Sequence, residues 1–153
     1  MNILSDHNVP NSLRINSKCK YFVEVNEISE FKNLYSFINE QKKPIFILGE
    51  GTNIIPTDYF DGIVIKPKFN HIKFDNIKST VSVGSSVNWH YFVEKMIGNN
   101  IYGYENLSLI PGSVGACPIQ NIGAYGQDVS ELILKIDCFD YKNNKLISLS
   151  NSE

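Results

Sequence analysis

Hydrophobic residues in the first third of the chain predict a strand, a helix and a second strand. Tyr21–Val25 is rich in aromatic and β-branched residues, which favours a strand. Residues 31–38 place apolar side chains at i, i+3, i+4 and i+7, one face of a helix, and Pro44 prevents its continuation. Ile45–Leu48 is an unbroken apolar run, which predicts a buried strand. Residues 1–20 are polar and are expected to form an irregular lead-in.

The middle of the chain predicts short strands and one helix. Three runs rich in Ile, Val and Thr favour strands. Apolar residues then repeat at helical spacing over residues 89–97, which predicts a helix with Asn88 or Ser86 as its N-cap. Trp89 and Met96 lie on that apolar stripe and are expected to be core residues rather than cofactor contacts. The strand candidates are Gly62–Lys66, Ile72–Asp75 and Thr80–Val83.

A glycine-interrupted segment and a hairpin are expected in the last third. Residues 107–126 contain four glycines and two prolines, which predicts a long loop. Ile133–Tyr141 and Leu146–Leu149 are apolar runs, and Asn143–Asn144 between them favours a hairpin turn. Residues 150–153 resemble the capped first turn of a helix, so the chain is expected to be truncated at its C-terminal end.

Composition indicates one soluble globular domain. The chain has 153 residues, 42% hydrophobic and 20% charged, close to the globular average. A net charge of −2 offers no basic surface for nucleic acid or an anionic membrane. No apolar run approaches the ~18 residues of a membrane helix, and no cationic and apolar leader opens the chain. We therefore expect a cytoplasmic protein with neither nucleic acid nor membrane as a partner.

Cysteines and histidines offer little evidence for a metal site. The cysteines are odd in number and lack CxxC spacing, so reduced apolar thiols are expected. His7 and His71 have no cluster of ligating partners, and His90 is expected to make a structural hydrogen bond. The only arginine, Arg14, is expected to be solvated or to cap a turn. The cysteines are Cys19, Cys117 and Cys138.

The first candidate binding segment is Gly49-Glu50-Gly51-Thr52-Asn53, directly after a predicted strand. Glycine tolerates positive φ and lets backbone N–H groups converge on phosphate oxygens. The segment is not a P-loop, because it lacks the Gly-Lys-Ser/Thr ending. It also lacks the third glycine of the dinucleotide fingerprint, because Ile54 stands there. Taken alone, an ordinary tight turn remains the simpler interpretation.

The second candidate segment, residues 110–126, is apolar and yet contains four glycines. This combination is expected where backbone lines a pocket, with side chains packed inward and amides left free. Two such segments in one small domain could clamp an extended ligand that carries phosphates and a flat apolar ring.

These motifs resemble a known family. Ile47–Asn53, Asn88–His90, Tyr104–Leu107 and Ile110–Gly126 are similar to the N-terminal FAD-binding domain of bacterial UDP-N-acetylenolpyruvoylglucosamine reductases. The resemblance runs from about residue 11 to residue 153. It implies an α+β fold, the two-subdomain FAD-binding domain of the vanillyl-alcohol-oxidase type, incomplete at its C-terminus.

The resemblance also implies a domain division. Residues 1–20 would be the lead-in and residues 21–153 the FAD-binding domain. Its N-terminal subdomain would cover about 21–83, and a second, truncated subdomain would begin at about 84. The substrate domain of the family would be absent.

The activity that the resemblance implies is an NADPH-dependent reduction in peptidoglycan synthesis. It converts UDP-GlcNAc-enolpyruvate, a nucleotide sugar, to UDP-N-acetylmuramate. FAD would bind noncovalently, because residues 49–53 contain no histidine for flavin attachment. NADPH would be the co-substrate. The cofactor-binding positions carried over are Gly49, Glu50, Gly51, Thr52, Asn53, Ile110, Pro111, Gly112, Gly115, Ala116, Ile119 and Gly123.

Part of the family pattern is missing or altered. The family's catalytic arginine, in a Tyr-Arg-x-Ser motif, and its serine and glutamate lie beyond Glu153, so the chain alone is expected to be inactive. Leu13-Arg14-Ile15 departs from the usual Phe-Gly-Ile. Ala116 lacks a hydroxyl, which removes a diphosphate hydrogen bond of about 0.5–1.5 kcal/mol. Three interpretations stay open: part of a reductase, a non-catalytic flavin-binding remnant, and a half-enzyme completed by a separate C-terminal chain.

Overall fold

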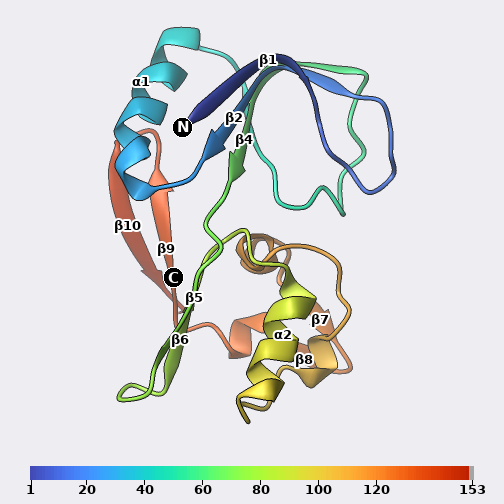
Figure 1. Ribbon diagram of the computed structural model, residues 1–153, viewed down its shortest axis with the longest axis vertical. Helices are drawn as coiled ribbons and strands as arrows, with labels where there is room; N and C mark the ends of the chain where they lie inside the picture. Colours follow the sequence, from blue (N-terminus) through green and yellow to red (C-terminus); the bar gives the residue numbers. More distant parts are fainter. Residues whose placement is uncertain (152–153) are drawn as a thin grey trace.

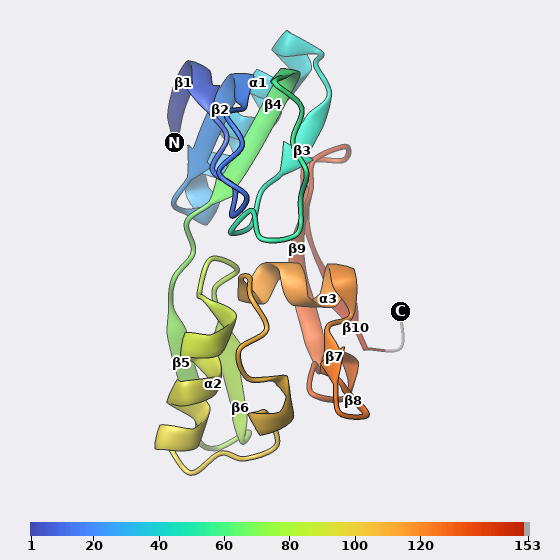
Figure 2. The same cartoon turned by 90° about the vertical axis from the view of Figure 1, so that its right-hand side faces the viewer.

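The computed structural model describes residues 1–151, which form two lobes (Figure 1). One lobe holds β1 to β4 and α1, and the other holds β5 to β8 with α2 and α3. The hairpin β9–β10 runs alongside both lobes (Figure 2). The N-terminal elements are β1 (Asn2–Asn8), β2 (Lys18–Val25), α1 (Phe31–Gln41), β3 (Ile45–Ile47) and β4 (Tyr59–Pro67). The remainder are β5 (Ile72–Asp75), β6 (Thr80–Val83), α2 (Trp89–Gly98), α3 (Cys117–Gln120), β7 (Gly123–Ala124), β8 (Gln127–Asp128), β9 (Lys135–Asp140) and β10 (Lys145–Ser150).

The first lobe is a four-stranded sheet of order β1-β2-β4-β3 with α1 packed on one face. β4 runs parallel to both of its neighbours, and β1 is antiparallel to β2. Side chains alternate along β4 because successive residues of a strand face opposite sides. Ile63 and Ile65 therefore pack with Leu34 and Ile38 of α1, whereas Val64 faces the other side.

Two expectations for this lobe are wrong. Residues 2–8 are not irregular but form the edge strand β1, since Leu4 packs with the core and His7 lies 5.0 Å from the ring of Phe22. The run Ile45–Leu48 does contain a strand, β3, and Leu48 is buried, but the expected burial is wrong for Phe46 and Ile47, which are 39% and 61% exposed. The reason is topological, because β4 inserts between β2 and β3 and leaves β3 at the edge.

The second lobe is built around α2, as the helical spacing predicts. Asn88 is the N-cap, and its side chain accepts a hydrogen bond from the N–H of Tyr91 at 2.9 Å. Trp89 and Met96 are buried core residues, and the indole of Trp89 donates to the carbonyl of Leu107 at 2.7 Å. The β5–β6 hairpin packs against this core through Ile72, Val81 and Val83.

The β9–β10 hairpin follows the expected turn, with Asn144 at φ 52°. Phe139 of β9 stacks on Phe31 of α1, with ring centroids 4.4 Å apart, and so links the hairpin to the first lobe. Ser150 ends β10 and Asn151 lies in a turn, so neither begins a helix, and residues 152–153 of that expected helix start lie outside the described residues.

The long loop expected at residues 107–126 is partly wrong. It contains α3, in which Pro118 occupies the first turn, where its missing N–H costs no hydrogen bond. Asn121 ends this helix in a left-handed conformation at φ 41°. Among residues 1–151, no helix is long and apolar enough to cross a membrane.

Candidate functional site

The structure brings the two candidate segments into contact. The hydroxyl of Thr52 donates to the carbonyl of Pro111 at 3.3 Å. The side-chain amide of Asn53 donates to the side-chain oxygen of Gln120 at 2.8 Å. These contacts join residues about sixty positions apart in sequence, so the first glycine loop lies against the second.

Glycines permit this close approach. A Cβ built on Gly49 would lie 3.0 Å from the hydroxyl of Ser113 and 3.5 Å from the Cβ of Ala116. A Cβ on Gly115 would lie 2.5 Å from the Cβ of Ser85. The backbone of Gly112 has φ 135°, which disfavours any residue with a side chain. The glycines thus maintain two contacts, one between the loops and one between the second loop and the turn that joins β6 to α2.

A third segment, residues 9–17, supports the first loop. The N–H of Ser12 donates to the carbonyl of Gly51 at 2.9 Å. Gly51 has φ 72°, and a Cβ there would lie 2.4 Å from the carbonyl oxygen of Pro10. The sequence suggested that Gly51 admits a phosphate, but its immediate neighbour is this segment.

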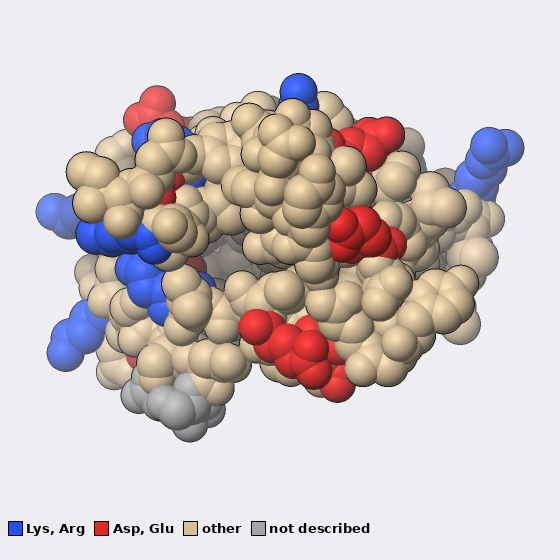
Figure 3. Space-filling view, turned by 90° about the horizontal axis from the view of Figure 1, so that it is seen from below, with Lys and Arg blue, Asp and Glu red and all other residues tan. Residues whose placement is uncertain are grey.

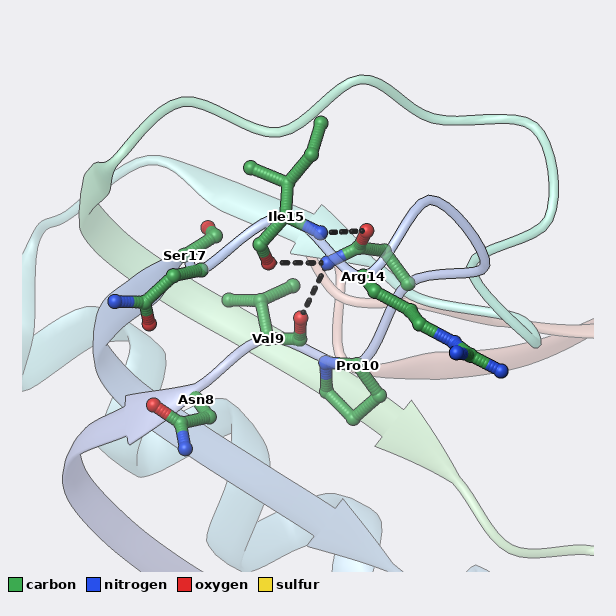
Figure 4. Close-up of a pocket in the computed structure, with 8 residues that line it drawn as sticks. Asn8, Val9, Pro10, Arg14, Ile15 and Ser17 are labelled. Carbon is green, nitrogen blue, oxygen red and sulfur yellow. Dashed lines mark hydrogen bonds between the residues drawn. The ribbon is translucent and has the colours of Figure 1, made fainter.

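The side chain of Asn11 fixes the shape of the 9–17 segment. It donates to the carbonyls of Val9 and Ile15 at 3.0 and 2.9 Å and accepts from the N–H of Ile15 at 3.0 Å. Figure 4 shows these bonds at the edge of a cavity of about 330 Å³, from which the side chain of Arg14 extends outward. Arg14 is exposed and has φ 57°. Residues 9–17 of the expected lead-in thus form a turn that hydrogen bonds from Asn11 hold in shape.

The turn between β6 and α2 anchors the second loop. The N–H of Gly115 donates to the carbonyl of Ser85 at 2.9 Å, and that of Val114 donates to the carbonyl of Val87 at 2.8 Å. The N–H of Trp89 donates to the carbonyl of Gly112 at 2.9 Å. The second loop is therefore held by backbone bonds at the N-terminal end of α2.

Charged groups near the first loop are Glu50 and Lys66. The side-chain amide of Asn88 donates to both carboxylate oxygens of Glu50, at 3.0 and 3.1 Å. The ammonium of Lys66, from the end of β4, donates to the carbonyl of Gly49. Burial lowers the pKa of Lys66, and the nearby Glu50 opposes that shift. The first loop is thus connected to both lobes.

Other predicted positions differ in their surroundings. Ile119 is 85% exposed, so no protein side chain covers it. Gly123 lies in β7, and a Cβ there would lie 2.3 Å from the carboxylate of Asp128, so the β7–β8 turn explains this glycine. Cys117 is buried, which raises the pKa of its thiol to about 12 and makes it unreactive. The side chain of His90 accepts a hydrogen bond from the N–H of Leu109 at 3.3 Å, which confirms its structural role.

Sequence reasoning missed three contributors. Ser85, Ser113 and Lys66 contact the glycine loops but stand outside the motif positions that were carried over. For Ser85, the sequence offered a signal: Gly84-Ser85-Ser86 is a small polar run between a predicted strand and a predicted helix. Lys66 was also signalled, because a lysine there ends an otherwise apolar predicted strand.

Comparison with known proteins identifies the family. The profile of the FAD binding domain family matches residues 19–150. The chain belongs to this family. Its curated relatives include the UDP-N-acetylenolpyruvoylglucosamine reductases of Pseudoalteromonas translucida, 36% identical over 141 residues, and of Salmonella typhimurium, 33% identical over 145. The alignments cover 91% and 94% of this chain but 40% and 42% of those proteins, so the chain spans about two fifths of their length.

Solved structures agree on the fold. UDP-N-acetylenolpyruvylglucosamine reductase from Thermus caldophilus superposes with a TM-score of 0.62 at 18% identity, covering 89% of this chain and 46% of that one. The BBE-like 1 variant D396N of Physcomitrella patens gives a TM-score of 0.68 at 13% identity, covering 95% of this chain and 33% of that one. Both confirm the α+β FAD-binding fold of the vanillyl-alcohol-oxidase type that the motifs predicted.

The residues present fit FAD. Among the residues that the structure describes, none is a hydrogen-bond partner for the hydroxyl oxygen of Ser85, which is buried in a residue that lies beside Gly115. Such a hydroxyl is costly unless a ligand or water completes its bonds. Within residues 1–151, no cluster of three or more His, Cys, Asp or Glu could hold a metal ion. On the face seen from below, Lys and Arg side chains gather mainly at the left and Asp and Glu side chains mainly at the centre and right, so no basic surface runs across it (Figure 3).

Proposed function

We propose that this chain is the FAD-holding part of an NADPH-dependent reductase that converts UDP-GlcNAc-enolpyruvate to UDP-N-acetylmuramate for peptidoglycan synthesis. The observation that carries the proposal is the contact between residues 49–53 and residues 110–120, the two segments that also hold the family motifs. The names of the curated relatives support the same reaction.

The chain's own residues would hold the cofactor. We propose that Gly49, Glu50, Gly51, Thr52 and Asn53 bind its diphosphate noncovalently, and that residues 110–123 line the diphosphate and ring. Bound FAD supplies hydride transfer, with NADPH as the source of the electrons. Ser113, 3% exposed and next to Gly49, would orient the first loop. The full set proposed is Gly49, Glu50, Gly51, Thr52, Asn53, Ile110, Pro111, Gly112, Gly115, Ala116, Ile119 and Gly123.

The domain division stays a prediction. We propose two subdomains, and the packing of the β5–β6 hairpin against the α2 core favours a boundary nearer Lys68 than residue 84. The catalytic arginine, serine and glutamate of the relatives would lie outside residues 1–153. A cytoplasmic location and a nucleotide-sugar substrate are part of the same proposal, whereas nucleic acid and membrane are not.

Two other candidates share the flavin site, namely a non-catalytic remnant and a half-enzyme completed by a second chain. The nucleotide sequence past codon 153 separates them. An in-frame continuation that encodes the Tyr-Arg-x-Ser motif and a substrate domain supports the reductase. A stop codon followed by separate substrate-domain code supports a remnant or a split enzyme. Addition of NADPH and substrate to the FAD-loaded full-length product then measures the reaction itself, through loss of absorbance at the NADPH band.

A further inference from the structure

The two glycine loops carry the wrong charge for a diphosphate. Residues 49–53 contain one charged side chain, the carboxylate of Glu50, and residues 110–126 contain none. Asn88 holds both oxygens of that carboxylate at the loop. A diphosphate bound there would meet a like charge, and like charges disfavour each other most where water is partly excluded. A cation from another element would offset this repulsion.

Lys66 occupies the position that this charge balance requires. It lies near the end of β4, and strand alternation turns it away from α1, on the same side as Val64. Its ammonium donates a hydrogen bond to the carbonyl of Gly49, the first residue of the loop. An ammonium has three donors, so this bond uses only one of them.

The surroundings of Lys66 explain why it is not simply a solvated lysine. The residue is half-buried, and burial disfavours its charged form, as does the neighbouring ammonium of Lys68. Glu50 and Glu24 act in the opposite direction. Glu50, on the same loop, compensates part of this buried charge, and a diphosphate bound at the loop would add further negative charge beside it.

We propose that Lys66 is the positioning residue that supplies the positive charge for a diphosphate bound by the two glycine loops. This inference rests on the proposed FAD-binding function and adds to it the electrostatic partner of the diphosphate. The alternative is that Lys66 has only a structural role, as the donor of a hydrogen bond to the Gly49 carbonyl. The two roles have different requirements: the structural role needs only a hydrogen-bond donor, whereas the diphosphate role needs a positive charge.

Three substitutions separate charge from hydrogen bonding. Lys66→Gln keeps a donor for the Gly49 carbonyl but removes the charge. Lys66→Met removes both, and Lys66→Arg keeps both. Lys68→Met is the matched control, because Lys68 is exposed and its ammonium pairs with Glu24 at 3.0 Å. Thermal melts of all four establish that each variant is folded before binding is measured.

The test is calorimetric titration of the 153-residue chain with ADP, which carries the diphosphate without the flavin, and with adenosine as the uncharged control. We expect Lys66→Gln and Lys66→Met to weaken ADP binding by about 10- to 100-fold, the range of one hydrogen bond to a charged group. Lys66→Arg and Lys68→Met should stay within about threefold of the unmodified chain, well under the tenfold that 1.4 kcal/mol represents. Added salt should weaken ADP binding less in Lys66→Gln than in the unmodified chain.

The outcomes are distinct. If Lys66→Gln binds ADP as tightly as the unmodified chain, the proposal is overturned and Lys66 has only a structural role. Failure of the unmodified chain to bind ADP at millimolar concentration also overturns it. A parallel titration with FAD tests the proposed function separately, because a chain that binds ADP through Lys66 but takes up no FAD would contradict the function and leave the diphosphate site standing.

Discussion

Replacement of Gly51 by alanine should destabilise the protein through two separate costs, a strained backbone conformation and overlap with neighbouring backbone atoms. The residue has φ 72°, and a left-handed conformation costs a non-glycine residue about 1–2 kcal/mol. The new Cβ would also lie 2.4 Å from the carbonyl oxygen of Pro10 and 2.9 Å from the Cα of Asn11, both backbone atoms. Shifting backbone to relieve such overlap costs about 1–3 kcal/mol more. The sum is about 2–5 kcal/mol, a large share of the 5–15 kcal/mol typical of a folded domain.

Two other glycines separate these contributions. Gly126 has φ 80°, but a Cβ added there would meet nothing within 4 Å, so Gly126→Ala should show only the conformational cost of about 1–2 kcal/mol. Gly98 has neither strain nor neighbours and lies in α2, so Gly98→Ala should stabilise by roughly 0.5–1 kcal/mol. Urea denaturation followed by circular dichroism measures all three free energies of unfolding. A Gly51→Ala loss no larger than that of Gly126→Ala would refute the packing of residues 9–17 on the first loop.

Two further predictions concern single side chains. Asn88→Ala removes the N-cap bond to Tyr91 and the bonds to Glu50, and should lower the free energy of unfolding by about 0.5–2 kcal/mol in the same urea experiment; an unchanged midpoint contradicts the capping role. The pKa of Glu24 is lowered chiefly by the side chain of Lys68, so its folded pKa lies below its unfolded pKa of 4.5. Its stabilising contribution is therefore present above that unfolded value and lost as pH falls through the folded pKa. Glu24→Gln should reduce the fall in the free energy of unfolding between pH 6 and pH 3 by about 0.2–1 kcal/mol, the range for a partly exposed pair. Urea midpoints taken across this pH range measure it. If the variant and the unmodified chain show the same fall, the pair contributes nothing.

Local patterns predicted most helices and strands, and long-range packing decided the rest. The apolar spacing around Trp89 and the cap at Asn88 are local signals, so α2 was predicted correctly. The exposure of Ile47 could not be predicted, because it depends on β4 inserting between β2 and β3. β1 was missed because an edge strand with one exposed face needs few apolar residues, and Leu4 alone gave little signal.

The candidate site, too, could be predicted from the sequence only as far as local patterns reach. The glycines indicated two backbone-lined loops, but their meeting depends on the packing of the two lobes. The sequence assigned Gly51 to phosphate approach, whereas its closest neighbour is Pro10, a residue from a segment with no evident pattern. Lys66 and Ser85 were missed because their local signals, a lysine at the end of an apolar strand and a small polar run, do not by themselves relate them to the site, whereas their position beside the loops does.

Titration of the purified chain with FAD tests the central claim most directly. We expect saturable quenching of flavin fluorescence with one FAD per chain, release of all flavin on acid precipitation, and a raised melting temperature, since a ligand that binds only the folded state stabilises it. Gly115→Val, which drives a side chain into Ser85, should weaken this binding, whereas Gly98→Ala should not. A folded chain that takes up no FAD at tens of micromolar would contradict the claim that these two loops hold the cofactor.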